Sequence, residues 1–319
     1  MIPEDFRYSF GPVPSRRLGR SLGINNIPSK VCTYSCAYCQ VGRTERMEAE
    51  RRFFHEPEDI FRDVESRLGE ARAASEQVDY LAFVPDGEPT LDVNLGKEIL
   101  LLKALGVPVG VITNSSLLWR EDVREELGRA DWVSVKIDAA REEVWRKVNR
   151  PHKALSLSRV LDGILAFSAS FGGELVTETM LVGDLNDGAD CIEGIADVIQ
   201  TVRPRRAYLS IPTRPPAESW VRCPEEEALN RAYQILAGKV RHVEYLIGYE
   251  GNSFAFTGDV AKDLLSITAV HPMREEAVDT LLSRAGSSRE VVDRLVAQGH
   301  IARTRYDGHI FYLRRFAKE

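Results

Sequence analysis

The sequence predicts an α/β protein whose main domain is a partial (β/α)6 barrel, in which a parallel sheet curves like part of a barrel. Two observations predict this fold. Short, nearly continuous apolar runs alternate six times with longer amphipathic stretches, which is the pattern of buried parallel strands separated by helices. Polar or unusual residues follow each run, and barrels of this type carry such residues on loops at the carboxyl ends of their strands.

The apolar runs and the stretches between them define the expected elements in order. The predicted strands are residues 21–25, 78–84, 107–113, 131–137, 174–182 and 207–212. Residues 57–73 and 94–106 have the apolar spacing of amphipathic helices, and Gly106 suits a helix C-cap. The loops after the six strands read CTYSCAYC, PDGEPT, NSS, DAA, GDLND and TRPP. Because parallel strands end at one edge of a sheet, we expect these loops to meet.

The pattern changes after about Ser266. Residues 271–285 and 287–299 predict two helices, and residues 300–316 predict two strands joined by a turn at Asp307–Gly308. Two helices followed by a hairpin outline a winged helix-turn-helix. The predicted division is therefore a lead-in segment (1–20), the partial barrel (21–250), a linker (251–265) and a winged-helix-like domain (266–319).

Composition sets broad limits on the class of protein. The chain has 319 residues, is 44% hydrophobic and carries a net charge of −6, so we do not expect the whole molecule to attract polyanions. Its first residues do not form a secretory signal, and no apolar run is long enough for a membrane span. The odd count of five cysteines does not suggest a disulfide framework. These features predict a cytoplasmic protein without a membrane partner.

Three cysteines, Cys32, Cys36 and Cys39, lie in the loop after the first strand with the spacing C-x3-C-x2-C. A structural zinc site normally takes four protein ligands, and the nearest histidine is the more distant His55. A disulfide leaves one thiol over and suits an oxidising compartment. A [4Fe–4S] cluster usually takes four thiolates, so three leave one iron open to another ligand. The spacing therefore favours an iron–sulfur cluster with an open position.

At these residues the chain resembles the radical S-adenosylmethionine (SAM) superfamily. The resemblance implies a partial β/α barrel with a [4Fe–4S] cluster in the loop after the first strand, SAM bound to the open iron, and an electron donor such as flavodoxin or ferredoxin. It further implies reductive cleavage of SAM to a 5′-deoxyadenosyl radical that abstracts hydrogen from a substrate.

The same resemblance implies contacts to SAM. Tyr38 would pack near the adenine, and Lys136 would meet the methionine carboxylate. The segment DGEP is similar to the family's GGEP, which bonds the methionine amino group, although Asp86 replaces the first glycine. The remaining candidates for SAM binding are Gly87, Glu88 and Pro89 of that segment, Asp138 for a ribose hydroxyl, and Asn114 and Ser115 for ribose or carboxylate. The alternatives are a loop turn for DGEP, an exposed strand end for Lys136, and a turn with a helix cap for Asn114 and Ser115.

Other residues are candidates for the substrate site. Arginines before the first strand suit a phosphate or carboxylate, or else form a solvated cluster. The candidates are Arg16, Arg17, Arg20, Arg214, Glu178, Asp184 and Asn186. Cys191 and Cys223 are expected to pack among apolar side chains. In the C-terminal region the basic residues able to touch a phosphate backbone are Arg303, Arg305, Arg314, Arg315 and Lys318.

Three functions remain open. The segments GPVPSRRLGRSLGIN, CTYSCAYCQVGRT and ITAVHPMREEAV are similar to wyosine-type tRNA synthases, which implies an RNA or tRNA substrate. Archaeal wyosine synthases hold a second cluster, for which this chain has no cysteine before Cys32. The alternative substrate is a protein, peptide or small metabolite, because the strand with Lys136 and Asp138 resembles a D-x-K segment of activating enzymes. The third function is an iron–sulfur redox sensor that binds DNA.

Overall fold

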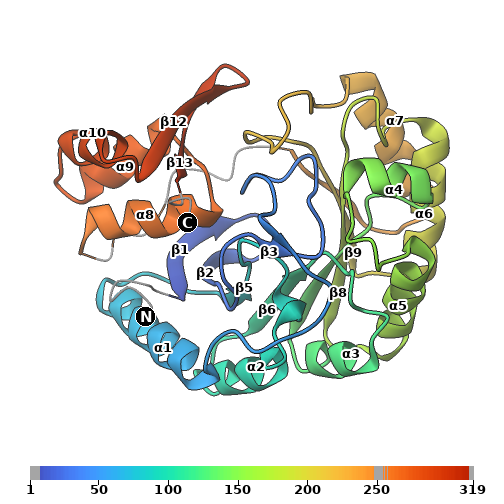
Figure 1. Cartoon of the computed structure of the whole chain (residues 1–319), viewed down its shortest axis with the longest axis horizontal. Coiled ribbons are helices and arrows are strands. Elements are labelled where there is room, and N and C mark those ends of the chain that lie inside the picture. The colour runs from blue at the N-terminus through green and yellow to red at the C-terminus, as the bar shows by residue number, and fades with distance from the viewer. Residues whose placement is uncertain (1–7, 248–253, 255, 257, 316–319) are drawn as a thin grey trace.

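A curved eight-stranded sheet forms the framework of the protein in the computed structural model, which describes residues 8–247, 254, 256 and 258–315. Its strand order is β1-β2-β5-β6-β7-β8-β9-β10; β1 is antiparallel to β2 and all other neighbours are parallel. The strands are β1 (Ser9–Ser15), β2 (Gly19–Ile24), β5 (Tyr80–Phe83), β6 (Val109–Thr113), β7 (Trp132–Lys136), β8 (Glu174–Met180), β9 (Arg206–Ser210) and β10 (Val243–Leu246). The sheet curls into a partial barrel (Figure 1).

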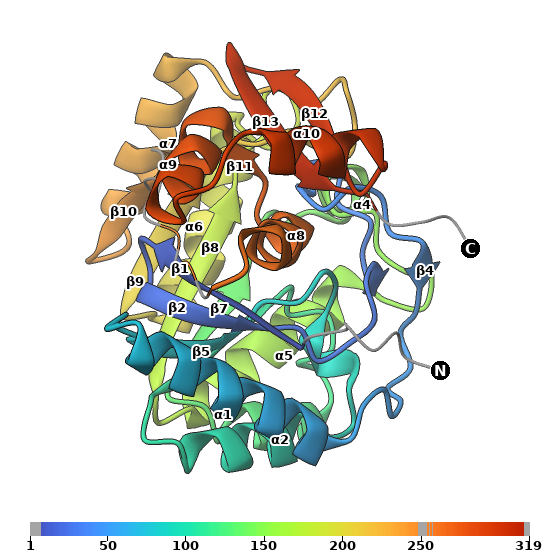
Figure 2. The same ribbon diagram turned by 90° about the vertical axis from the view of Figure 1, so that its left-hand side faces the viewer.

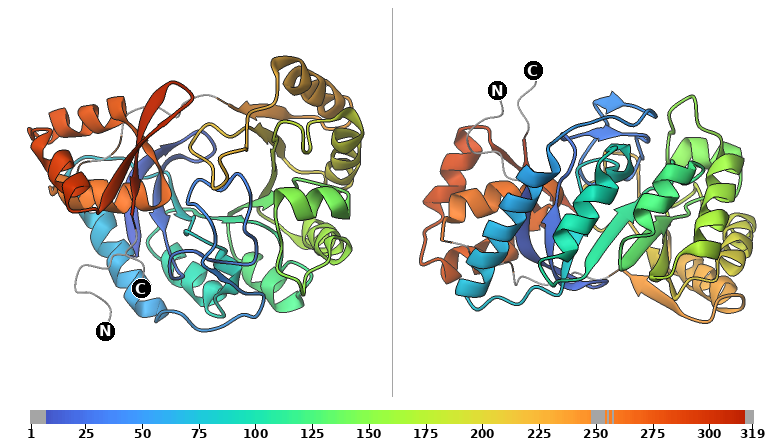
Figure 3. Two further views of the ribbon diagram at one scale, coloured as in Figure 1. Left: turned by 45° about the horizontal axis from the view of Figure 1, so that its top comes forward. Right: turned by 90° about the horizontal axis from the view of Figure 1, so that it is seen from below.

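Helices line the outside of the sheet (Figures 1 and 3). They are α1 (Pro57–Ala73), α2 (Leu95–Lys103), α3 (Glu121–Leu127), α4 (Glu142–Val148), α5 (Leu157–Ser170), α6 (Ala189–Val202) and α7 (Glu226–Ala237). Smaller elements are β3 (Val31–Cys32), β4 (Arg46–Met47) and the 3-10 turn η1 (Pro89–Leu91). Apolar side chains of these helices and of the sheet form one large buried core. No described helix is both long and apolar enough to cross a bilayer.

The predicted partial barrel is confirmed, and its six predicted strands are β2 and β5 to β9. The sheet has two further strands that the sequence did not predict. β1 lies in the predicted lead-in segment and contains Pro12 and Pro14, which oppose strand formation. It is tolerated because it is an edge strand, paired on one side only. β10, at the other edge, is only partly buried and lacks a continuous apolar run.

A C-terminal unit, defined here as residues 258–315, follows the barrel. Its elements are α8 (Val260–Val270), β11 (Met273–Arg274), α9 (Glu275–Arg284), α10 (Glu290–Ala297), β12 (Ile301–Tyr306) and β13 (His309–Arg314). The strands form a small sheet of order β11-β13-β12, and the two predicted helices and the hairpin are present. α8 begins inside the predicted linker and continues into the predicted C-terminal domain. Residues 1–7 of the lead-in, most of residues 248–257 and Lys318 lie outside the described residues.

The C-terminal unit shares a hydrophobic core with the edge of the barrel. Phe10 and Val13 of β1 are buried among apolar side chains of α8, α9 and the small sheet. α8 packs against β1 (Figure 2). A buried ion pair also crosses this interface, because Arg67 of α1 contacts Asp263 of α8 at 3.0 Å. Tyr306 at the hairpin tip donates a hydrogen bond of 2.8 Å to the Pro212 carbonyl beyond β9. The C-terminal unit therefore contacts the barrel at two places, at β1 and at the loop after β9.

Candidate active site

One cavity of about 350 Å³ lies inside the curve of the sheet. This volume is within the range of small-molecule sites. Its lining comes from the cysteine loop, from the carboxyl ends of the parallel strands, from the β1–β2 hairpin and from the C-terminal unit. The barrel interior next to the cavity is filled by a cluster of buried apolar side chains: Leu18, Ala82, Trp132, Val176 and Tyr208. The expected meeting of strand-end loops therefore occurs, and it encloses a site.

Cys32, Cys36 and Cys39 all line this cavity. Two asparagine amides point at sulfur: Asn114 Nδ2 lies 3.5 Å from Cys32 Sγ, and Asn149 Nδ2 lies 3.5 Å from Cys36 Sγ. Burial raises the pKa of each thiol, that of Cys36 to about 12. A bound cation is what deprotonates such buried thiols, since a metal-coordinating thiol loses its proton outright. Without a metal these three thiols are therefore neutral, and binding of a cluster would release their protons.

The donor set distinguishes between kinds of metal site. Within the described residues, no three Cys, His, Asp or Glu side chains converge so as to hold a single metal ion. A closed zinc site needs such convergence with four ligands. An iron–sulfur cluster instead takes one thiolate on each of several irons, so its sulfurs stand apart around a shared space. Three cysteines around one cavity fit a [4Fe–4S] cluster, and the amide donors fit the hydrogen bonds that tune its sulfurs.

The DGEP turn packs directly on the cysteine loop. Lys30 N donates to the Asp86 carbonyl at 2.9 Å, and Glu88 N donates to the Val31 carbonyl at 3.2 Å. A Cβ on Gly87 would overlap that same Val31 oxygen, so only glycine allows the two backbones to approach. Gly87 and Glu88 line the cavity, whereas Pro89 opens η1 outside the lining.

Gly87→Ala is expected to lower the free energy of unfolding by about 1–3 kcal/mol, because the new methyl group forces the two loops apart. Cluster content after anaerobic reconstitution should fall as well. The matched control is Gly69→Ala in α1, where a Cβ meets nothing within 4 Å; alanine there should be neutral or stabilising. Urea unfolding with iron analysis measures both effects. Equal behaviour of the two variants would contradict the tight approach.

Glu88 joins the second strand-end loop to the third. Its carboxylate accepts hydrogen bonds from Thr90, from Thr113 Oγ1 at 2.6 Å and from Asn114 N at 2.7 Å. Burial raises the pKa of Glu88, and these donors oppose the rise. Asn114 lines the cavity. Ser115 does not: it is buried, and its Oγ accepts from Lys136 N at 2.8 Å, which connects β6 to β7. A role for Ser115 toward SAM stays a prediction.

Tyr38 and Lys136 face each other in the cavity. Lys136 Nζ lies 5.2 Å from the Tyr38 ring centroid and 3.0 Å from Glu178 Oε1. Tyr38 donates its hydroxyl hydrogen to Asp138, which also accepts from Asn149 Nδ2 at 2.7 Å and Met180 N at 2.8 Å. Asp138 is buried behind Tyr38, outside the main cavity lining. The structure thus places Asp138 as support for the tyrosine; contact with a ribose stays a prediction.

Of the substrate candidates, some reach the cavity and others do not. Arg16, Arg17, Glu178 and Arg214 line it. Burial raises the pKa of Glu178, but Arg17 and Lys136 outweigh burial and lower it to about 2. Three candidates lie outside the lining. Arg20 pairs with Glu76, and Asp184 pairs with Arg222 at the surface. Asn186 forms hydrogen bonds with backbone groups at the end of β8. Glu178 is therefore the anionic candidate at the cavity.

Several cavity residues were missed from the sequence. Gln40 follows the last cysteine, and His271, Arg274 and Phe311 come from the C-terminal unit. No local motif marks these residues, because the contact depends on how the unit packs on the barrel. Of the two remaining thiols, Cys191 packs at the margin of the main core and Cys223 donates to the Pro212 carbonyl at 3.1 Å. Both lie outside the cavity lining.

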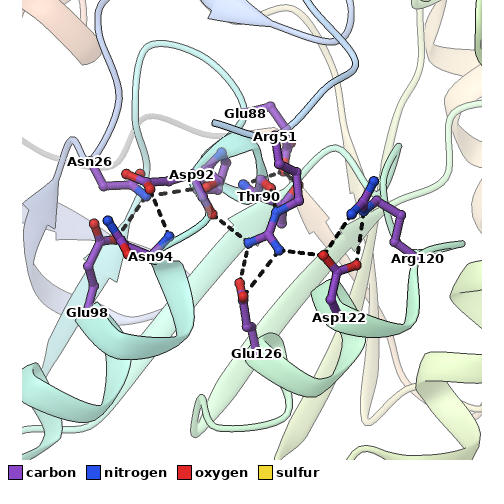
Figure 4. Close-up of polar contacts among 11 residues, drawn as sticks. Asn26, Arg51, Glu88, Thr90, Asp92, Asn94, Glu98, Arg120, Asp122 and Glu126 are labelled. Atoms are coloured by element: carbon purple, nitrogen blue, oxygen red, sulfur yellow. Dashed lines mark hydrogen bonds and ion pairs between the residues drawn. The ribbon is translucent and has the colours of Figure 1, made fainter. Parts of the chain in front are cut away.

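A buried polar network supports the DGEP side of the site (Figure 4). Arg51 donates to the carbonyls of Thr90 at 2.9 Å and Asp92 at 2.6 Å, which anchors the turn after DGEP. Next to it, the buried carboxyl groups of Asp92 and Glu98 face each other, and a hydrogen bond between them requires that one of the two be protonated. Burial raises the pKa of Asp92 to about 7 and that of Glu98 well above its usual value. The folded pair therefore keeps a proton that the unfolded chain has lost at neutral pH.

Each such proton lowers the free energy of unfolding by about 1.4 kcal/mol per pH unit as the pH rises above the unfolded pKa values. Glu98→Gln keeps the hydrogen bond without the titrating proton, so the fall in stability between about pH 5 and pH 8 should become shallower. Urea unfolding across this range measures the slope. Glu125→Gln, at an exposed position of α3, should leave it unchanged. Parallel curves for the parent and Glu98→Gln would contradict the shared proton.

Comparisons with known proteins agree with the geometry. The family model described as the radical SAM superfamily matches residues 26–199. The chain is 46% identical over 309 residues to UPF0026 protein MJ1312 of Methanocaldococcus jannaschii, covering 96% of this chain and 95% of that protein. It is 36% identical over 208 residues to UPF0026 protein slr1464 of Synechocystis, covering 65% of this chain and 76% of that protein.

Solved structures share the fold at low identity. A radical SAM methyltransferase from Sphaerobacter thermophilus superposes with a TM-score of 0.53 and 15% identity, over 71% of this chain and 66% of that one. A structure of TYW1 with a lysine-pyruvate adduct bound gives a TM-score of 0.53 and 15% identity, over 69% and 74%. These structural similarities show only that the barrel fold is shared. Membership of a family is shown by the family model and by the relative that is 46% identical. The chain belongs to the radical SAM superfamily of enzymes.

Proposed function

We propose that this enzyme binds a [4Fe–4S] cluster at Cys32, Cys36 and Cys39 and SAM beside it, and abstracts hydrogen from a substrate held in the same cavity. The observation that carries the proposal is that the three thiols share one cavity with the candidate SAM-binding side chains of Tyr38 and Lys136. The cluster, when bound, supplies the electron that splits SAM into methionine and a 5′-deoxyadenosyl radical.

The chain's own residues position SAM and exclude water. Lys136 presents a cation for the methionine carboxylate, and Glu178 holds that cation in place. Tyr38 offers an aromatic face, and its orientation is set by Asp138. The main-chain carbonyls of the packed DGEP turn suit an ammonium group. Packed apolar side chains below and the C-terminal unit at the side keep bulk water from a radical that would otherwise be quenched.

The substrate class that we place first is RNA, as a base in tRNA. The similarity of three sequence segments to wyosine-type tRNA synthases supports it. A protein, peptide or small metabolite is the second candidate. It is favoured by α10, the helix that a winged-helix-like domain would present, because Arg289 at its start pairs with Glu275 and Asp279. This pairing offsets the charge of Arg289, and α10 itself carries Glu290 and Asp293 beside Arg294 rather than a basic face.

The test uses the anaerobically reconstituted full chain with dithionite, or reduced flavodoxin or ferredoxin, as electron donor. SAM should be converted to 5′-deoxyadenosine; failure to form it would overturn the enzyme proposal and leave a redox sensor. Deuterium-labelled tRNA, peptide and metabolite pools are then supplied separately. Deuterium in 5′-deoxyadenosine from the tRNA pool, with salt-dependent tRNA binding, supports RNA. If deuterium comes only from the peptide or the metabolite pool, the substrate belongs to the second class.

A further inference from the structure

We propose that Arg214, His271 and Arg274 bind a phosphate group of the substrate, so that the C-terminal unit forms part of the substrate site. The inference rests on the proposed function, which places the substrate in this cavity. It specifies that the substrate is anionic, and it names the residues that bind its phosphate group. All three side chains line the cavity, and they come from two separate parts of the fold.

Arg214 and His271 meet where the barrel contacts the C-terminal unit. Arg214 lies in the loop after β9, and its Nη2 is 3.1 Å from His271 Nε2 at the end of α8. Arg214 Nη1 also donates to Gln40 Oε1 at 2.6 Å, and Gln40 directly follows Cys39. His271 is 8% exposed and packs edge-on against Phe254, with ring centroids 5.1 Å apart. The two nitrogen-bearing groups are thus held beside the cysteine loop.

Arg274 is positioned by the small C-terminal sheet. It lies in β11, opposite Phe311 of β13, and its guanidinium carbon is 5.7 Å from the Phe311 ring centroid. Both residues line the cavity. Strand pairing fixes the backbone of Arg274, and the aromatic ring restricts its side chain. A guanidinium held in this way is suited to a phosphate, because its planar fork can donate two parallel hydrogen bonds.

The charge of the cavity favours an anion. Among the described lining residues, five are basic and two are carboxylates. The basic residues are Arg16, Arg17, Lys136, Arg214 and Arg274. Glu178 already pairs with Arg17 and Lys136, and Glu88 accepts from Thr113 and Asn114. The described lining therefore carries more guanidinium and ammonium groups than carboxylates, and these groups suit a phosphate.

The C-terminal unit forms a fixed wall of this site. Its apolar side chains share a core with Phe10 and Val13, and Arg67 pairs with the fully buried Asp263. This shared core and the buried ion pair join the elements that carry His271 and Arg274 to the barrel. His271 and Arg274 therefore stand at set positions before substrate arrives, which is what selection of one anionic group requires.

The experiment measures binding of inorganic phosphate and pyrophosphate by calorimetry to the reconstituted protein with SAM. Arg214→Gln and Arg274→Gln should each weaken binding about 10-fold, the loss of one charged hydrogen-bonding group. Arg274→Lys, which keeps the charge, should recover part of it. The control is Arg241→Gln at an exposed position just before β10, which should bind as the parent does. Binding that is absent, or equally weakened in Arg241→Gln, overturns the inference.

Two further arms separate the source of the phosphate and the underlying proposal. Displacement of bound pyrophosphate by tRNA identifies an RNA phosphate, whereas displacement by a nucleoside monophosphate but not by tRNA identifies a small phosphorylated substrate; both results support the site. Formation of 5′-deoxyadenosine is measured on the same samples. SAM cleavage without phosphate binding overturns this inference alone. Loss of SAM cleavage in the parent overturns the proposed function instead.

Discussion

Cys36→Ala is expected to reduce the formation of 5′-deoxyadenosine to the level of a protein-free blank. The remaining two thiols cannot hold three corners of the cluster, so the reconstituted variant should lack both the iron content and the SAM-dependent spectral change of the parent. Anaerobic reconstitution, iron and sulfide analysis, electron paramagnetic resonance with and without SAM, and chromatography of the nucleoside products measure these effects. The same result is expected for Cys32→Ala and Cys39→Ala.

Cys191→Ala and Cys223→Ala are the matched controls, because both thiols lie outside the cavity lining. They should keep the parent's cluster content and product yield. Full activity of Cys36→Ala would remove the basis of the proposed function. Loss of activity in all five variants would point instead to general damage during reconstitution.

Asp263→Ala is expected to lower the free energy of unfolding by about 3 kcal/mol, because it removes the nearer and fully buried carboxylate partner of the Arg67 guanidinium. Arg67 keeps a hydrogen bond to the Gly11 carbonyl of β1 at 3.1 Å and a contact with Glu70 at 3.4 Å, but the Glu70 carboxylate is more distant and partly exposed, so it does not replace Asp263. Urea unfolding of the full chain measures the loss. Since the pair joins α1 to α8, phosphate binding at the C-terminal wall should weaken at the same time.

Two variants make this result decisive. Asp197→Ala removes the carboxylate of an exposed pair with Lys239 and should not lower stability, because solvent screens such pairs. The double variant Arg67→Met with Asp263→Leu should regain most of the lost stability, since apolar groups of similar size can replace a buried ion pair. A double variant as unstable as Asp263→Ala would show that packing, rather than the uncompensated charge, accounts for the loss.

The sequence by itself determined the barrel and the grouping of three cysteines in one loop. Both follow from local patterns in the sequence. A strand buried on two faces appears as a continuous apolar run, and Cys32, Cys36 and Cys39 lie within a single loop. The sequence also predicts that the strand-end loops meet, because parallel strands end at one edge of a sheet. Tyr38, Gly87 and Lys136 were placed at the cavity for the same reason.

Only the tertiary structure decided which polar side chains face the cavity and what closes its open side. Asp138 and Ser115 turn away from the cavity to bond Tyr38 and Lys136, a choice set by neighbours on other strands. β1 is a strand because β2 offers it an edge, against the preference of its prolines. His271 and Arg274 reach the site because a core formed by segments more than two hundred residues apart seats the C-terminal unit there. No local pattern encodes such contacts, since their energy comes from apolar burial between distant segments rather than from neighbouring residues.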